Sequence, residues 1–247
     1  MTPRRLALAS VLLGAFFLLG FQPQPVPVRP ADRIVAGFSR TTVASVADAV
    51  DQVCHRRGFL SHDVRPYVAG KFVGRARTSL TRPAPPEQAT PTLAVKSSVE
   101  MIDSALPGEV GIIVMEGSLD VAAIGGLMAT AAKARGMAGM VLDGSMRDIE
   151  EIRGLGLPVY ARGATPATAV GRYAAIARDV EVTCGGVKIS PGDIIVAGED
   201  GVVAVPKDQA EAVLKRAQQI DERETEMVPF IKKFRSLTKA IETFNRI

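Results

Sequence analysis

Hydrophobic residues follow a helical spacing near the start of the folded chain and a strand-like spacing soon after it. Apolar side chains at 43, 46, 50 and 53 recur at helical intervals, and Gly58 is expected to end that helix. Residues 69–81 then alternate as a strand does. The proline-rich stretch 82–91 predicts a loop, because proline fits neither regular structure in its interior.

The centre of the chain alternates between short helical patterns and continuous apolar runs. Apolar runs of this length, bounded by glycine or proline, are typical of buried strands. Alternating strands and helices favour an α/β fold with some parallel pairing. The predicted helices are 98–106, 122–136 and 148–156, and the predicted strands are 109–117, 137–144 and 157–163.

The pattern changes after residue 180. Residues 180–206 contain short apolar stretches separated by Gly-Gly, Pro-Gly-Asp and Glu-Asp-Gly turns, which predicts a β-rich second half. Helix is expected from Lys207 onward. Near the end, apolar residues recur every three or four positions and form a stripe that suits another helix, another subunit or the same domain. These residues are Phe230, Phe234, Leu237, Ile241 and Phe244.

The first 21 residues have the pattern of an export signal. Arg4 and Arg5 precede an apolar run from Leu6 to Phe21, which is slightly short for a transmembrane helix. We therefore expect an exported protein, periplasmic or secreted, or one that an uncleaved residue 6–21 segment anchors in the membrane. Residues 22–31 read as a proline-rich linker. An α/β domain over 32–228 and a C-terminal amphipathic helix over 229–247 complete the predicted organisation.

Composition adds few constraints. The net charge of +4 falls to +2 without Arg4 and Arg5, since 28 basic residues then face 26 acidic ones. We therefore expect no nucleic-acid partner. The two cysteines, Cys54 and Cys184, permit a disulfide in an exported protein or are two separately buried thiols. Cys54, His55 and His62 lack a zinc-site spacing.

Two glycine-containing turns follow predicted strands, where ligands bind in open α/β sheets. In the first, residues 117–129, Gly125-Gly126 precede a helix whose first amides could receive a small carboxylate. Close helix packing is the alternative reason for that glycine pair. The spacing matches neither a dinucleotide-binding motif nor a phosphate-binding loop.

The second turn, residues 143–148, ends in Arg147-Asp148. An arginine offers a planar fork to a carboxylate, and an aspartate offers oxygen to a hard cation. Asp148 with Glu151 three residues later is also the pattern of a helix start related to the capping box. On spacing alone, that local role is the favoured interpretation.

Longer stretches carry a family resemblance. Residues 135–166 and 184–206 resemble the family of 4-hydroxy-4-methyl-2-oxoglutarate aldolases and RraA-type ribonuclease regulators, some formerly labelled demethylmenaquinone methyltransferases. The resemblance extends from about Thr41 to Glu226. It implies a layered α/β/β sandwich, with an N-terminal signal or anchor segment and C-terminal helices added here. It also implies assembly into a homotrimer or hexamer with sites between subunits.

The resemblance implies roles for both turns. Arg147 would bind the carboxylate or oxo group of a pyruvate-like substrate, and Asp148 would hold Mg²⁺ or Mn²⁺. Backbone amides around Gly125, Gly126, Leu127 and Met128 would bind the substrate carboxylate.

The implied activity is metal-dependent carbon–carbon cleavage of a small 2-oxo diacid through a pyruvate enolate. Candidate reactions are 4-hydroxy-4-methyl-2-oxoglutarate or 4-carboxy-4-hydroxy-2-oxoadipate aldol cleavage and oxaloacetate decarboxylation. The alternative is a non-catalytic regulatory or binding protein of the RraA type on the same scaffold. One position departs from the aldolases: Gly126 stands where they commonly carry an acid, so another group must accept the proton of the 4-hydroxyl. Asp120, or an acid from 221–226 of a neighbouring subunit, is a candidate substitute.

Overall fold

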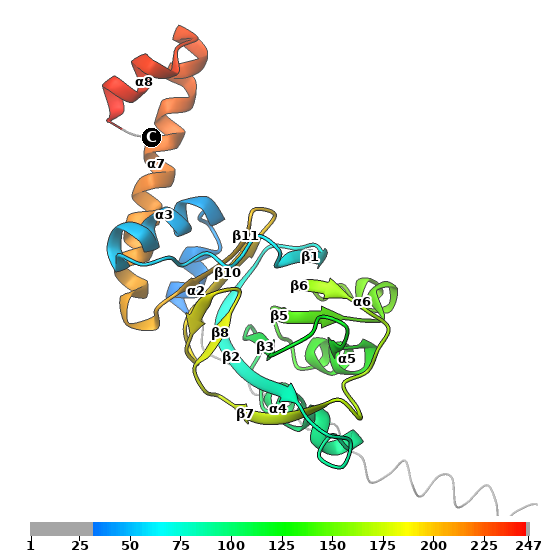
Figure 1. Cartoon of the computed structure of the whole chain (residues 1–247). Coiled ribbons are helices and arrows are strands. Elements are labelled where there is room, and N and C mark those ends of the chain that lie inside the picture. Colours follow the sequence, from blue (N-terminus) through cyan, green and yellow to red (C-terminus); the bar gives the residue numbers. More distant parts are fainter. Residues whose placement is uncertain (1–31, 246–247) are drawn as a thin grey trace, which may run out of the picture.

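The computed structural model describes residues 32–245 (Figure 1). The predicted signal or anchor segment 1–21 and the linker 22–31 lie outside these residues. Within the described residues, no helix combines the length and the apolar character needed to cross a membrane.

A mixed nine-stranded sheet organises the domain. Its main path runs β1-β6-β5-β3-β2-β10-β11, with β4 paired to β5 and β7 paired to β2. The pairs β2-β3, β3-β5, β5-β6 and β4-β5 are parallel, as the alternating pattern predicted, and the remaining pairs are antiparallel. Among the described residues, strands β8 and β9 pair only with each other and form a separate hairpin. The strands are β1 Arg65–Val68, β2 Phe72–Pro83, β3 Val110–Met115, β4 Ala122–Ile124, β5 Gly139–Met146, β6 Val159–Ala164, β7 Tyr173–Arg178, β8 Val182–Cys184, β9 Val187–Ile189, β10 Ile194–Gly198 and β11 Gly201–Val205.

Helices cover two separate regions of this sheet (Figure 1). Helices α4, α5 and α6 pack on one face of the parallel part through a core that contains Met101, Leu142 and Ile152. Helices α2, α3 and α7 pack on β10 and β11 through a second core. The helices are α2 Arg33–Phe38, α3 Val43–Cys54, α4 Pro91–Asp103, α5 Gly126–Ala134, α6 Ile149–Leu155, α7 Ala210–Phe234 and α8 Leu237–Phe244, with a 3-10 turn, η1, at Lys207–Gln209.

The predicted α/β class is confirmed. The two separate β layers expected of an α/β/β sandwich are instead joined in one strongly curled sheet. The opposite face of the parallel part meets the β8-β9 hairpin and the inner face of β10 in a third core, which includes Tyr160, Cys184 and Ile195. Residues along β10 alternate between this core and the one beneath α3, so the strand is buried on both faces. The two expected β layers are therefore largely parts of a single, nearly closed sheet.

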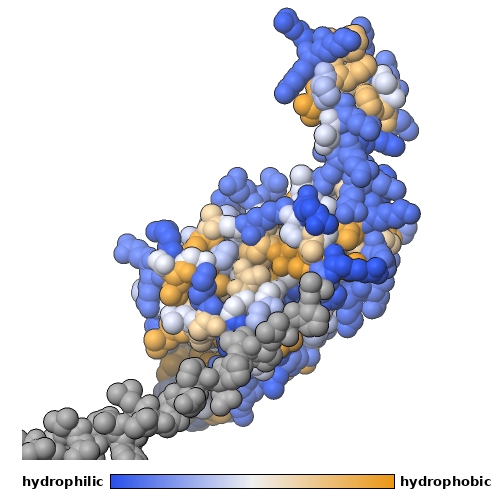
Figure 2. Space-filling view, turned by 180° about the vertical axis from the view of Figure 1, so that it is seen from behind, coloured by the Kyte–Doolittle hydropathy of each residue, from blue (hydrophilic) through white to orange (hydrophobic). Residues whose placement is uncertain are grey.

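The C-terminal stripe folds back on itself. Helix α7 contains Pro229 and ends at Phe234, and Arg235 caps it in a left-handed conformation. Helix α8 then packs against α7. The Phe230 ring lies 4.6 Å from that of Phe234 and 5.6 Å from that of Phe244. This arm projects from the domain, and Figure 2 shows apolar surface at its tip, where Phe234 and Leu237 remain about half exposed.

Helices α3 and α4 have boundaries that differ from the sequence predictions. Helix α3 ends at Cys54 because His55 takes the left-handed cap, whereas Gly58 lets the following loop approach Val50. Helix α4 begins at Pro91 rather than 98, since proline is well tolerated at a first helical position and Thr90 caps the amide of Leu93.

Both cysteines are free thiols. Cys54 lies at the end of α3 and Cys184 in β8, so they belong to different cores and no disulfide joins them. Complete burial raises the pKa of the Cys184 thiol well above its ordinary value, which keeps it protonated and unreactive.

The close approach of β2 to the turn before β3 yields a stability prediction. A Cβ at Gly74 would overlap the carbonyl oxygen of Gly108, whereas a Cβ at Gly154 in α6 would meet no atom within 4 Å. Gly74→Ala should lower the free energy of unfolding by about 1–3 kcal/mol, as overpacking against backbone does. Gly154→Ala should keep or raise it, by up to about 1 kcal/mol. Urea denaturation measures both, and equal midpoints for the two variants would contradict the packing.

Candidate functional site

The two predicted turns meet because the strands before them are neighbours. Strand β4, which the sequence analysis did not predict, pairs in parallel with the end of β5, and the Arg147 amide donates to the Ile124 carbonyl at 3.1 Å. Parallel strands end at the same edge of a sheet, so Gly125-Gly126 after β4 lie beside Arg147-Asp148 after β5. Strand β4 has only three residues, two of them alanine, so the sequence shows no strand pattern there.

Asp148 joins the two turns directly. Its backbone is left-handed, with φ 58° and ψ 39°, and its side chain makes no capping bond to α6. Instead, its Oδ2 accepts a hydrogen bond from the Gly126 amide at 2.9 Å. The capping-box interpretation is therefore wrong, because a left-handed residue before α6 directs its carboxylate across to the start of α5. Aspartate tolerates this conformation better than most residues, and such outliers gather at functional sites.

The two glycines of the α5 turn leave room for charged side chains from the following turn and helix. A Cβ at Gly125 would lie 2.7 Å from Oδ2 of Asp148 and 2.9 Å from Nε of Arg147. A Cβ at Gly126 would overlap the carboxylate of Glu151. The glycine pair therefore admits the side chains of Arg147, Asp148 and Glu151 to the start of α5. The sequence analysis had weighed the approach of a bound anion against helix packing and had not predicted these contacts.

The site offers several donors to an anion. Nε of Arg147 lies 3.6 Å from Oδ2 of Asp148, and the Arg147 side chain is 40% exposed. Its terminal guanidinium nitrogens have no acceptor among residues 32–245, and neither have the amides of Leu127 and Met128 in the described chain. Backbone amides at a helix start and a free guanidinium both suit a carboxylate.

Glu151 is the site residue that sequence reasoning assigned only to capping. It lies in the first turn of α6, and its carboxylate occupies the space beside Gly126. The alternative acid Asp120 instead accepts a hydrogen bond from the Ser118 hydroxyl at 2.7 Å. The sequence could not indicate this role, because it does not show that Gly126 leaves room for an acid carried by another helix.

The Asp148 carboxylate suits a cation that keeps several water ligands better than a cation coordinated only by protein side chains. Oδ1 of Asp148 has no hydrogen-bond or ion-pair partner within the described residues, so it is free to coordinate. No three His, Cys, Asp or Glu side chains converge as a metal site between residues 32 and 245. Mg²⁺ commonly binds through one or two carboxylates and keeps several waters, which is compatible with a site built on Asp148.

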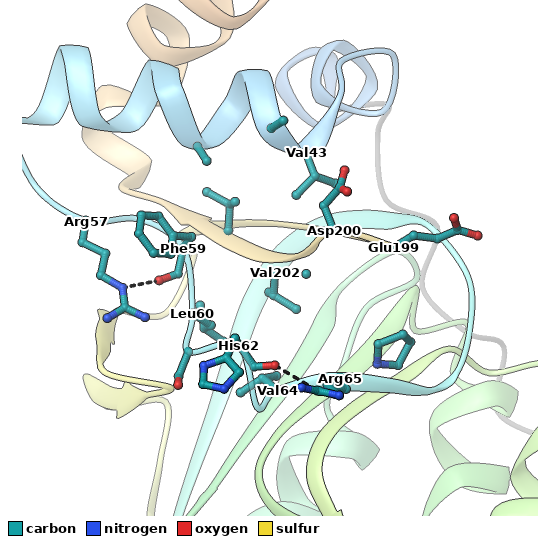
Figure 3. Close-up of a pocket in the computed structure, with 16 residues that line it drawn as sticks. Val43, Arg57, Phe59, Leu60, His62, Val64, Arg65, Glu199, Asp200 and Val202 are labelled. Carbon is teal, nitrogen blue, oxygen red and sulfur yellow. Dashed lines mark hydrogen bonds between the residues drawn. The ribbon is translucent and has the colours of Figure 1, made fainter.

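Two cavities are candidates for the binding site. An open cavity of about 410 Å³ adjoins the predicted residues and is lined by Met146, Arg147, Asp148, Ile149, Glu150, Ala164, Thr165 and Pro166. A larger one of about 710 Å³ lies between α3, the 57–66 segment and the β10-β11 turn (Figure 3). There, the Arg57 guanidinium lies over the Phe59 ring, and its Nε donates to the Phe59 carbonyl. The larger cavity contains none of the predicted site residues.

Comparisons with known proteins agree on one family. Residues 43–204 match the family model described as RraA-like, Aldolase/RraA. A protein of Halalkalibacterium halodurans provisionally named 4-hydroxy-4-methyl-2-oxoglutarate aldolase is 41% identical over 118 residues, which cover 46% of this chain and 54% of that protein. The chain thus aligns with about half the length of that relative.

Solved structures share the fold. An uncharacterised protein from Pseudomonas syringae pv. tomato has a TM-score of 0.77 at 27% identity, covering 90% of this chain and 100% of its own. Streptomyces coelicolor RraAS2, described as an unusual member of the RNase ES inhibitor RraA family, has a TM-score of 0.70 at 30% identity, with 81% and 97% covered.

The free guanidinium of Arg147 yields a binding prediction. Hydrogen bonds to charged groups contribute about 1.5–3 kcal/mol, so Arg147→Met should weaken oxalate binding by roughly 10- to 100-fold. Arg153→Met, on the exposed last turn of α6, is the matched control and should bind oxalate as the unmodified protein does. Isothermal titration calorimetry in the presence of Mg²⁺ measures both. Unchanged affinity in Arg147→Met would remove Arg147 from the site.

Proposed function

Since the chain belongs to the RraA-like family, we propose that it is a carbon–carbon lyase that releases pyruvate from a small 2-oxo diacid. The observation that carries the proposal is the convergence of Arg147, Asp148 and the open α5 amides at one edge of the sheet. An aldolase-named relative supports the same reaction class. The substrate class comes from the charges: cationic and amide donors face the space where two carboxylates would bind.

The chain's own groups suit the formation of an enolate. The amides of Leu127 and Met128 would hold the substrate carboxylate, and the Arg147 fork would lie against the 2-oxo group. As the carbon–carbon bond breaks, negative charge develops on the 2-oxo oxygen. Preorganised donors in that position lower the barrier because they need no rearrangement during the reaction. Asp148 is fixed by Gly126 and so holds this geometry in place.

A divalent cation held by Asp148 would add Lewis-acid stabilisation of the same oxygen. Oxaloacetate is the simplest test substrate, because losing CO₂ leaves the same enolate without removal of a hydroxyl proton. Cleavage of 4-hydroxy-4-methyl-2-oxoglutarate makes the additional demand of a base. Both reactions release pyruvate, which provides one common measurement.

A second candidate function is a non-catalytic binding protein on the same scaffold. It is favoured by Gly126, which replaces an acid expected of aldolases, and by the RNase ES inhibitor description of the family of Streptomyces RraAS2. A specific partner recovered in a fixed ratio, with no turnover over a panel of 2-oxo acids, would favour this function.

Assembly and export are further parts of the proposal. The homotrimer or hexamer is proposed from the family resemblance, and Leu127, 87% exposed in the first turn of α5, is a position that another subunit could cover. The apolar run Leu6–Phe21 supports an exported or membrane-anchored chain.

The role of Asp148 is tested by its removal. Asp148→Ala should lower Mg²⁺-stimulated pyruvate release from oxaloacetate on the order of 100-fold, the scale of losing one group that stabilises transition-state charge. It should also weaken Mn²⁺ binding measured by electron paramagnetic resonance, whereas Asp208→Ala, in the exposed η1 turn, should change neither. Chelation with EDTA should reproduce the loss in the unmodified protein. Full activity of Asp148→Ala would contradict the metal assignment.

A further inference from the structure

We propose that Glu151 is the catalytic base of an aldol cleavage, taking the place of an acid on α5. The inference rests on the proposed function, because it assigns the proton transfer that the site otherwise lacks. It extends the reaction from decarboxylation to 4-hydroxy-2-oxo acids, whose cleavage requires removal of the 4-hydroxyl proton.

Position is the first argument. Glu151 belongs to α6, yet its carboxylate lies where a side chain at Gly126 would begin, against the first turn of α5. The carboxylate of Asp148 lies instead against Gly125 and accepts from the Gly126 amide. Two carboxylates therefore meet the same turn at separate glycines, so one can hold the structure or a cation while the other remains free to move a proton.

The absence of competing bonds is the second argument. The Glu151 carboxylate has no hydrogen-bond or ion-pair partner within residues 32–245, and the side chain is exposed. Asp120 is bonded to Ser118, and Glu150 lines the cavity beside Asp148 without lying against Gly126. Among the described acids, Glu151 is therefore the one whose carboxylate lies against Gly126 and has no partner within residues 32–245.

Glu151 alone can account for both proton transfers of the reaction. Its carboxylate accepts the proton of the 4-hydroxyl, the C3–C4 bond breaks, and the C4 oxygen becomes the carbonyl of the leaving oxo acid. The bonding pair moves to C2–C3 as the C2 carbonyl becomes the enolate. Protonated Glu151 then gives its proton to C3, which yields pyruvate and restores the carboxylate. No oxidant, reductant or further reactant is consumed.

A purely structural role predicts different behaviour. An acid at the start of α5 would stabilise that helix through its dipole. Glu151→Gln would then lower stability and affect both reactions alike. A catalytic base predicts a split, because decarboxylation has no hydroxyl proton to remove.

The experiment compares two substrates in the intact protein with Mg²⁺. Glu151→Gln should lower kcat for 4-hydroxy-4-methyl-2-oxoglutarate on the order of 10²–10⁴-fold, the usual contribution of a general base, while oxaloacetate decarboxylation changes only a few-fold. In D₂O, the variant should also lose enzyme-dependent deuterium exchange into the pyruvate methyl group. Glu87→Gln, in the exposed loop before α4, should leave both substrates and the exchange unchanged.

Each of the following results would overturn the role of Glu151, and they also distinguish its failure from failure of the proposed function. Equal loss of both reactions in Glu151→Gln assigns a structural role, and selective loss in Glu150→Gln moves the base to that residue. If the unmodified protein decarboxylates oxaloacetate but does not cleave the hydroxy acid, the lyase stands and Glu151 is not a base. If it acts on neither, both proposals fail.

Discussion

The hydrogen bond from the Gly126 amide to Asp148 Oδ2, 2.9 Å long, holds the candidate site together. It joins the turn after β4 to the turn after β5, where Asp148 adopts a left-handed conformation that most residues would resist. Asp148 must be left-handed for its carboxylate to reach across, and Gly125 and Gly126 must lack side chains for the acids to approach. The bond is therefore a constraint on three residues at once, and the orientation of Arg147 depends on it.

The rest of the fold supplies a rigid support for that bond. Strand β5 lies between β3 and β6 and also pairs with β4, so its end is fixed from several directions. Its two faces are packed in different cores, with Leu142 beneath the helices and Val141 inside the curled sheet. A strand held on both faces and both edges moves little, which suits a site whose donors must be in place before charge develops.

The acids around the turn have separate structural origins, and this has a functional consequence. Asp148 precedes α6 and serves the α5 amide, whereas Glu151 lies one turn further along α6 and fills the space left by Gly126. The same glycine that removes an acid from α5 is the reason an acid from α6 can approach. The proposed role of Glu151 follows from this placement, since chemistry depends on where a carboxylate lies and not on which helix carries it.

The sequence by itself determined the α/β class, many of the strands and helices, and the chemistry of the two turns. Apolar runs identified β3, β5 and β6, and helical spacing identified α3, α6 and α7, because each pattern reports burial of one local face. Motifs and family resemblance selected Gly125, Gly126, Arg147 and Asp148. The tertiary structure decided what no local pattern encodes: the curling of one sheet, the folding of α8 onto α7, the left-handed Asp148 and the placement of Glu151 against Gly126. These depend on contacts between residues distant in the chain or on a backbone angle stabilised by such contacts, whereas periodicity reports only which side of a segment is buried.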